Sequence, residues 1–271
     1  MLSNALCMRL SLGLAFSLAL SLLPFDSGRL EAAETDYSAD LSARTYSAGL
    51  SVEPRLGLTQ VLWGDTATPF FGYIRPAVSA SASPTYFAGK VSLSLFPVSF
   101  LGVTFAKNWS HRYRETGGYD CHANTCLGSM DSSEVAFRFM TAYKSYFLSS
   151  QLQRVFYEAN SEGDQNLMDP INALIYKEGG STLANWGFII GKKVAKGVES
   201  GVIIQRGDLD GRISASEADY VFVRTKLEPY GFPSLSATFG LGRFNTDIKR
   251  PGISAIALLT YTGKAMVGPA L

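Results

Sequence analysis

Histidine, cysteine and charged residues are all scarce in this sequence. It has 2 His and 3 Cys among 271 residues, and charged residues make up only 17%. Because a histidine usually supplies the base that activates a nucleophile or a water, two histidines allow few catalytic arrangements. The net charge of +1 provides no strongly basic face for nucleic acid. We therefore expect a protein that binds no nucleic acid, and the sequence favours a non-enzymatic role over catalysis.

Long apolar runs are absent beyond the N-terminal segment. Arg9 precedes an apolar run over residues 10–23, which ends at Pro24. This run has the length of the apolar part of a signal peptide and falls short of the ~20 residues of a spanning helix. We predict a signal peptide over residues 1–33 and one domain over residues 34–271, with an uncleaved anchor helix as the alternative. An exported chain of this kind is soluble, bound to the surface or a membrane barrel.

An alternation of apolar and polar residues dominates the chain after this run. Leu50, Val52, Leu56 and Leu58 share one face of an extended segment, and the residues between them share the other face. Such a period of two indicates strands with one apolar and one polar face. We predict about 12 strands, within a range of about 10 to 12. Their expected bounds are 38–47, 50–63, 69–82, 86–96, 98–112, 133–148, 151–160, 182–195, 198–206, 218–228, 234–246 and 252–263.

Strand length and loop placement distinguish a membrane barrel from a soluble sandwich. Many segments run for about 10 to 14 residues, whereas soluble strands usually have about 5 or 6 and tilted membrane strands about 9 to 11. Tight turns are expected near residues 96–97, 149–150, 196–197 and 229–233, and long connections over 114–132, 160–181 and 207–216. Every long loop then lies on one side and both termini on the other, as in membrane barrels.

In these features the sequence resembles the bacterial outer-membrane β-barrel class. The resemblance rests on the signal peptide, the alternating segments, the turn at residues 95–99 and the placement of the loops. It implies an all-β fold, a closed antiparallel up-and-down transmembrane barrel, with the lipid bilayer of the outer membrane as its partner. Such barrels commonly end on an aromatic residue, whereas this chain ends at Leu271. A secreted soluble β-sandwich, with its apolar faces packed inward, is the alternative.

Charged residues recur on the polar faces, which a closed barrel would turn inward. They include Glu53, Arg55, Lys90, Glu134, Arg138 and Arg224, and the same assignment extends to Arg75, Arg154, Glu158, Glu199 and Arg206. These charges either pair with one another and fill the interior, or line a narrow channel for small polar or anionic solutes. Since about 12 strands lie between filled and open barrels, we predict either a narrow porin-like channel or a surface-exposed structural protein.

Two cysteines follow the signal peptide, an even number that suits an oxidising compartment. Cys121 and Cys126 flank residues 122–125 in the first long loop. A disulfide between them would close a small hairpin tip, and by chain entropy it contributes less than the ~3 kcal/mol of a loop of about 15 residues. The alternative is a metal site that adds His122, but zinc normally takes a fourth ligand, and none is evident nearby. We predict the disulfide.

Residues 206–217 resemble part of an EF-hand calcium loop. With Gly211 at the sixth position, Asp208, Asp210 and Glu217 fall at the third, fifth and twelfth positions. Arg206 occupies the first position, where a carboxylate belongs, and the flanking segments are strands rather than helices. The simpler interpretation is an exposed Asp-Gly turn with no cofactor, and a weak calcium site is the alternative.

An enzyme of this fold would be a lipase, a deacylase or a protease that acts at the outer rim. A phospholipase of this kind would need a histidine and a serine on one strand face. Ser110 and His111 are adjacent, so their side chains point to opposite faces. His111 could combine with Asp120 and Asp131 as in a protease, although their spacing does not require it. The hydrolase is the alternative function, and we assign no catalytic residue.

Overall fold

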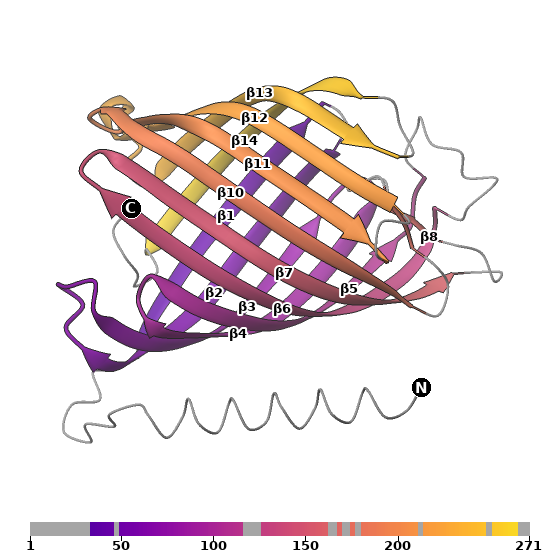
Figure 1. The fold of residues 1–271 in the computed structure, drawn as a ribbon, viewed down its shortest axis with the longest axis horizontal. Helices are drawn as coiled ribbons and strands as arrows, with labels where there is room; N and C mark the ends of the chain where they lie inside the picture. The colour runs from indigo at the N-terminus through magenta and orange to yellow at the C-terminus, as the bar shows by residue number, and fades with distance from the viewer. Residues whose placement is uncertain are drawn as a thin grey trace.

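The computed structural model describes residues 33–45, 49–115, 126–161, 167–169, 174–176, 180–210, 214–247 and 251–264. Within this part of the chain, twelve antiparallel strands form one closed barrel (Figure 1). The barrel strands are β1 (Glu34–Arg44), β2 (Gly49–Gly64), β3 (Phe71–Ala82), β4 (Tyr86–Val98), β5 (Leu101–Arg112), β6 (Gly128–Tyr143), β7 (Tyr146–Ser161), β10 (Ser181–Ala195), β11 (Val198–Leu209), β12 (Ser214–Lys226), β13 (Leu235–Thr246) and β14 (Gly252–Lys264). The predicted closed barrel is confirmed, and the alternative of a two-sheet sandwich is wrong.

Closure comes from pairing between the first and the last barrel strands. β1 and β14 align antiparallel, with Leu41 opposite Leu259. Near the same seam, the Lys264 ammonium lies 3.2 Å from the Glu34 carboxylate. Because every barrel strand has two neighbours, no backbone edge is left open to pair with another chain.

The two ends of the barrel differ in their connections. The turns at residues 98–101, 143–146 and 195–198 lie at one end, which we call the turn end, together with both ends of the described barrel chain. The two longest connections, over residues 112–128 and 161–181, lie at the other end, which we call the loop end. A separate two-stranded hairpin, β8 (Leu167–Asp169) and β9 (Leu174–Tyr176), belongs to the second of these connections. The expected placement of the two longest loops opposite the termini is therefore correct.

Three sequence predictions about connections were wrong. The turn expected at 96–97 lies at 99–100, because Phe96 and Pro97 belong to β4. The turn expected at residues 149–150 lies at 144–145 instead, where Lys144 adopts a left-handed φ of 56°. Ser150 is paired within the sheet opposite Phe188, so the two serines that suggested a turn are ordinary strand residues. The long connection expected over 207–216 is short, since β11 ends at Leu209 and β12 begins at Ser214. The turn at 144–145 carries no proline or glycine that would have marked it, whereas the connection between β11 and β12 contains the Asp210-Gly211 pair.

A single short helix interrupts the described strands. It is a 3-10 turn, η1 (Glu228–Tyr230), which links β12 to β13 at the turn end. It ends at Gly231, whose φ of 87° is left-handed and therefore suits glycine. No helix in the described part of the chain is both long enough and apolar enough to cross a membrane.

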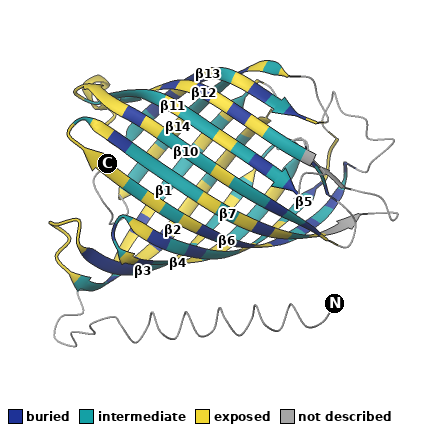
Figure 2. Ribbon diagram, in the orientation of Figure 1, coloured by how far each residue is buried: buried dark blue, intermediate teal, exposed yellow. Residues whose placement is uncertain are grey.

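Apolar side chains cover the outside of the barrel and polar ones line the inside. Leu56, Phe137 and Val221 are 50%, 58% and 64% exposed although each lies within a strand. The inward positions that alternate with such residues include the buried Thr59, Ser94 and Thr104. Figure 2 shows this alternation of buried and exposed residues along most strands. A protein surrounded by water would place these apolar groups inside, so the outer surface is suited to hydrocarbon.

Candidate functional site

A network of ion pairs covers the inner wall formed by β1 to β6. Asp36 accepts hydrogen bonds from Arg75 (Nε to Oδ2, 2.9 Å) and from the Thr59 hydroxyl at 3.2 Å. Arg55 lies 3.2 Å from Asp40 and 2.9 Å from Glu53. These groups come from three adjacent strands, and they neutralise one another within the interior.

The same wall contains a further ion pair and, on β6, an arginine with an unused hydrogen-bond donor. The Lys90 ammonium lies 2.7 Å from the Glu134 carboxylate, whose side chain is only 4% exposed. Arg138, four residues beyond Glu134 on the same face of β6, has a buried Nε with no hydrogen-bond partner among the described residues. Arg138 stands opposite Gln151 of β7 in the sheet register. The charged wall therefore ends where β6 meets β7, and Arg138 marks this boundary.

The six interior charges named from the sequence all face the lumen. Arg224 completes them, with Nη1 3.5 Å from Glu199 and Nε donating to the Thr238 hydroxyl at 3.3 Å. Arg154, Glu158 and Arg206 do not belong to this set, because their strand positions face outward. Arg206 pairs outside with Asp219 at 2.7 Å and lies over the Trp186 ring at 5.8 Å. The predictions for these three were wrong because, near the loop end, β7 and β11 turn apolar residues such as Val155 and Leu209 inward and their charged residues outward.

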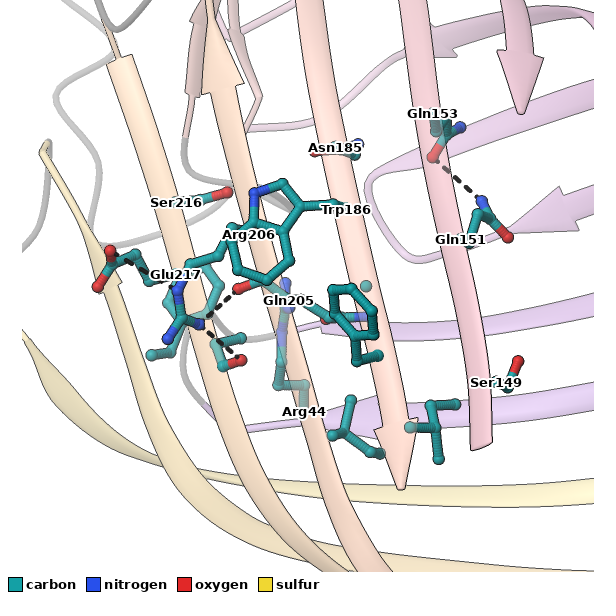
Figure 3. Close-up of a pocket in the computed structure, with 16 residues that line it drawn as sticks. Arg44, Ser149, Gln151, Gln153, Asn185, Trp186, Gln205, Arg206, Ser216 and Glu217 are labelled. Atoms are coloured by element: carbon teal, nitrogen blue, oxygen red, sulfur yellow. Dashed lines mark hydrogen bonds and ion pairs between the residues drawn. The ribbon is translucent and has the colours of Figure 1, made fainter. Parts of the chain in front are cut away.

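Mostly uncharged residues form the opposite inner wall, on β7, β10 and β11, with Glu199 near the turn end as an exception. A cavity of about 290 Å³ lies against this wall (Figure 3). Its inward-facing lining includes four carboxamides, together with serines, aliphatic residues and one arginine: Gln151, Gln153, Asn185, Gln205, Ser149, Ser216, Gly187, Ile189, Ile203, Ala218, Arg44 and Phe244. Gln151 donates to Gln153 at 3.3 Å, whereas Asn185 and Gln205 make no side-chain hydrogen bond within the described residues. We call this space the amide cavity.

A second cavity of about 250 Å³ lies beside the amide cavity. Tyr86, Asn108, Arg112 and Glu134 contribute to its lining, and Gln153 lines both cavities. Asn108 differs from the carboxamides of the amide cavity because its Nδ2 donates to Ser132 at 3.1 Å. The interior of the barrel therefore contains unfilled polar space on both sides of Gln153.

An apolar cluster narrows the lumen at the loop end. Leu174 and Tyr176 of β9 pack against inward-facing Val155, Leu183 and Leu209 of the barrel wall. The rings of Tyr157 and Tyr176 lie 4.4 Å apart between centroids. Strand β9 is therefore folded into the lumen. The connection between β7 and β10 thus contributes residues to the loop-end opening of the barrel.

Aromatic side chains fill part of the lumen at the turn end. Tyr73 is fully buried and stacks on Phe96 with 4.6 Å between ring centroids and 8° between ring planes. Phe71 and Val61 complete this cluster, and Met140 of β6 packs against it. Apolar side chains therefore occupy part of the lumen near both ends of the barrel.

Near the loop end, the outer face brings together a histidine and a serine. His111 Nδ1 of β5 and Ser129 Oγ of β6 lie 3.0 Å apart, and the two residues stand opposite each other in the register. The imidazole ring also lies 5.4 Å from the Phe87 ring. The sequence places only Ser110 next to His111, and a long loop between β5 and β6 separates Ser129 from His111 along the chain.

The predicted disulfide and calcium residues fall in different positions. Cys126 is buried next to β6, while Cys121 lies outside the described residues, so their bond stays a prediction. Asp210 accepts hydrogen bonds from the Ser181 hydroxyl (2.9 Å) and the Thr182 backbone amide (2.7 Å). Glu217 lies 3.8 Å from Arg206, and Asp208 is a residue of β11. The described residues contain no group of three or more acidic, histidine or cysteine side chains placed to hold a metal.

No protein-family model matches this chain, and no curated protein matches it. Among solved structures it is similar to the β domain of the Bordetella autotransporter BrkA, with 11% identity over 85% of this chain and 99% of that one and a TM-score of 0.44. It is also similar to an outer-membrane channel from Pseudomonas putida F1 (9% identity, 88% and 98% coverage, TM-score 0.44) and to the NanC porin (8%, 83% and 98%, TM-score 0.42). Identities and TM-scores this low assign no function to the chain.

Proposed function

We propose that this chain is an integral β-barrel of the bacterial outer membrane, exported by a signal peptide over residues 1–33. The observation that supports this proposal most directly is the reversed polarity of the barrel. Exposed Leu, Val and Phe side chains surround it, and the charged network lies inside. Closed barrels satisfy all their backbone hydrogen bonds internally, which is what a strand needs in order to lie in hydrocarbon.

Within that membrane, the proposed role is a narrow porin-like channel for small polar solutes. The polar cavities of about 290 and 250 Å³ support this role, since a purely structural barrel has no need of unfilled polar space. The charges on β1 to β6 are largely paired, so they occupy one side of the lumen and leave the uncharged side available. Arg138 adds a cationic group to the inner wall, which suits small anions as well as neutral solutes.

Separate measurements test the membrane assignment and the channel function. Folded membrane barrels resist unfolding in detergent, so unboiled protein should migrate differently from boiled protein in a denaturing gel. Purified protein in liposomes should then allow uptake of small polar solutes and should conduct ions in planar bilayers. A heat-modifiable protein that gives neither uptake nor conductance would instead be a structural barrel. A protein that stays in the soluble fraction without detergent would contradict the membrane assignment itself.

The His111–Ser129 pair supports a second candidate, an acyl hydrolase acting at the outer rim. A serine hydroxyl 3.0 Å from an imidazole nitrogen can transfer its proton to that base while it attacks a carbonyl. The pair lies on the outward face near the loop end, where the ester groups of lipids would be in reach. Hydrolysis of a fluorogenic acyl ester by detergent-solubilised protein, lost in Ser129→Ala and retained in Ser110→Ala, would establish this function. Equal, background rates for all three proteins would exclude it.

A further inference from the structure

We infer that the amide cavity is a binding site for a neutral polyhydroxylated solute, such as a sugar or a polyol. The inference rests on the proposed channel function and specifies which class of solute the channel accepts. Its volume of about 290 Å³ lies near the lower end of ligand pockets, which span about 300–1,000 Å³, so the ligand is small.

The hydrogen-bonding capacity of the cavity lining favours a ligand with several hydroxyl groups. Each carboxamide has an oxygen that accepts and an NH₂ group that donates, which matches a hydroxyl group in both of its roles. Asn185 and Gln205 keep this capacity unused within the described residues, and Ser149 and Ser216 add two hydroxyls to the lining. A solute with several hydroxyl groups can bond to these side chains simultaneously, whereas a solute with a single polar group cannot.

The shape of the wall leaves space for a ligand at Gly187. Gln151 of β7 and Gln205 of β11 both stand opposite Gly187 of β10 in the register. A side chain at Gly187 would meet its nearest atoms at 3.8 and 3.9 Å, so its absence leaves a real recess in the wall. Figure 3 shows Gln151 and Gln153 on one strand and Asn185 on the neighbouring strand. Because Gly187 has no side chain, it leaves space between Gln151 and Gln205.

The charges that line the amide cavity favour a neutral ligand. The ionised side chain on the inward lining is Arg44, and its guanidinium already lies over the Phe244 ring at 4.8 Å from the centroid. The other charged lining residues, Arg206 and Glu217, are directed outward and lie 3.8 Å from each other. Carboxamides outnumber charges on this wall, in contrast to β1 to β6, and this composition favours a neutral ligand over an ion.

The test measures equilibrium binding of glucose and of glucuronate to the folded full-length protein in detergent by saturation-transfer NMR. We expect saturable binding of glucose that is at least about 10-fold weaker in Asn185→Leu and Gln205→Leu, since a hydrogen bond to a buried polar group is worth roughly this factor. Asn108→Leu is the matched control, because that carboxamide lies in the lumen but already bonds to Ser132. It should bind glucose within about two-fold of the unmodified protein.

Every outcome of the binding measurement either supports or contradicts the proposed sugar site. Glucuronate binding tighter than glucose, equal losses in Asn185→Leu and Asn108→Leu, or no saturable glucose binding would each overturn it. Liposome uptake of glucose tests the channel function separately from the binding site. Uptake without saturable binding would leave the channel function standing and remove the site. Saturable binding that depends on Asn185, without any uptake, would support the site and contradict the channel.

Discussion

Arg75 of β3 extends past Gly57 of β2 to reach Asp36 of β1. A side chain at position 57 would collide with the Arg75 guanidinium, so the glycine allows an ion pair to span three strands. Arg75 and Asp36 are separated by 39 residues in the chain, and both side chains are largely buried. The pair therefore ties the beginning of the barrel to its third strand, close to the seam where the sheet closes.

The Asp36–Arg75 pair should contribute strongly to the stability of the barrel. Asp36→Ala leaves the Arg75 cation buried without its partner, which typically costs about 3–5 kcal/mol. Glu217→Ala removes a carboxylate that is half exposed, and surface pairs contribute only about 0–1 kcal/mol. Urea unfolding in detergent micelles should show this difference as a large loss for Asp36→Ala and a small one for Glu217→Ala. Comparable midpoints for the two variants would show that the interior pair is not structural.

Arg138 should set the ion preference of the channel. Its replacement by glutamine removes a cation from the lumen, so the reversal potential in a salt gradient should shift toward cations. Arg154→Gln makes the same chemical change on the outer face of β7 and should leave the reversal potential unaltered. An equal shift in both variants would mean that permeating ions do not pass Arg138.

The inward-folded β9 should restrict passage through the mouth. Replacing both Leu174 and Tyr176 with serine weakens their packing against Leu183 and Leu209, and the conductance should rise as β9 separates from the wall. Ile175, which lies between them on the other face of β9, provides the control, since Ile175→Ser keeps the buried contacts. A conductance that does not change in the double variant would show that the route bypasses β9.

The outer surface should be intolerant of charge at mid-depth. Val221 lies near the centre of β12 and is 64% exposed, so Val221→Arg would place a cation against hydrocarbon at a cost of about 2–4 kcal/mol. Ser92→Arg introduces the same side chain on the inner face of β4 and should cost much less. Refolding into lipid vesicles, followed by urea titration, measures both. If the two variants are equally stable, the outer surface does not face lipid.

The sequence alone predicted the barrel because the pattern behind it is local. Each strand alternates with a period of two, and this period identifies the two faces without knowledge of any neighbour. The inward position of Glu53, Arg55 and Lys90 followed from this pattern. It failed for Arg154 and Arg206, because near the loop end apolar residues such as Val155 and Leu209 face inward and the charged residues of the same strands face outward.

Connections were harder to predict than strands. The turn at residues 144–145 relies on a left-handed Lys144, a conformation that lysine seldom adopts and that no sequence signal announces. The inward fold of β9 depends on apolar contacts with Val155 and Leu209, which belong to strands on either side of the hairpin. Loop sequences alone do not specify such contacts.

By itself, the amino-acid sequence determined that the chain forms long amphipathic strands with charges on their polar faces. Only the tertiary structure decided which polar groups meet. The ion pair of Asp36 with Arg75, the carboxamides around Gly187 and the approach of Ser129 to His111 all depend on strand register. Register is a property of strand pairs and of barrel closure, because a shift of one residue would move each side chain to the opposite face.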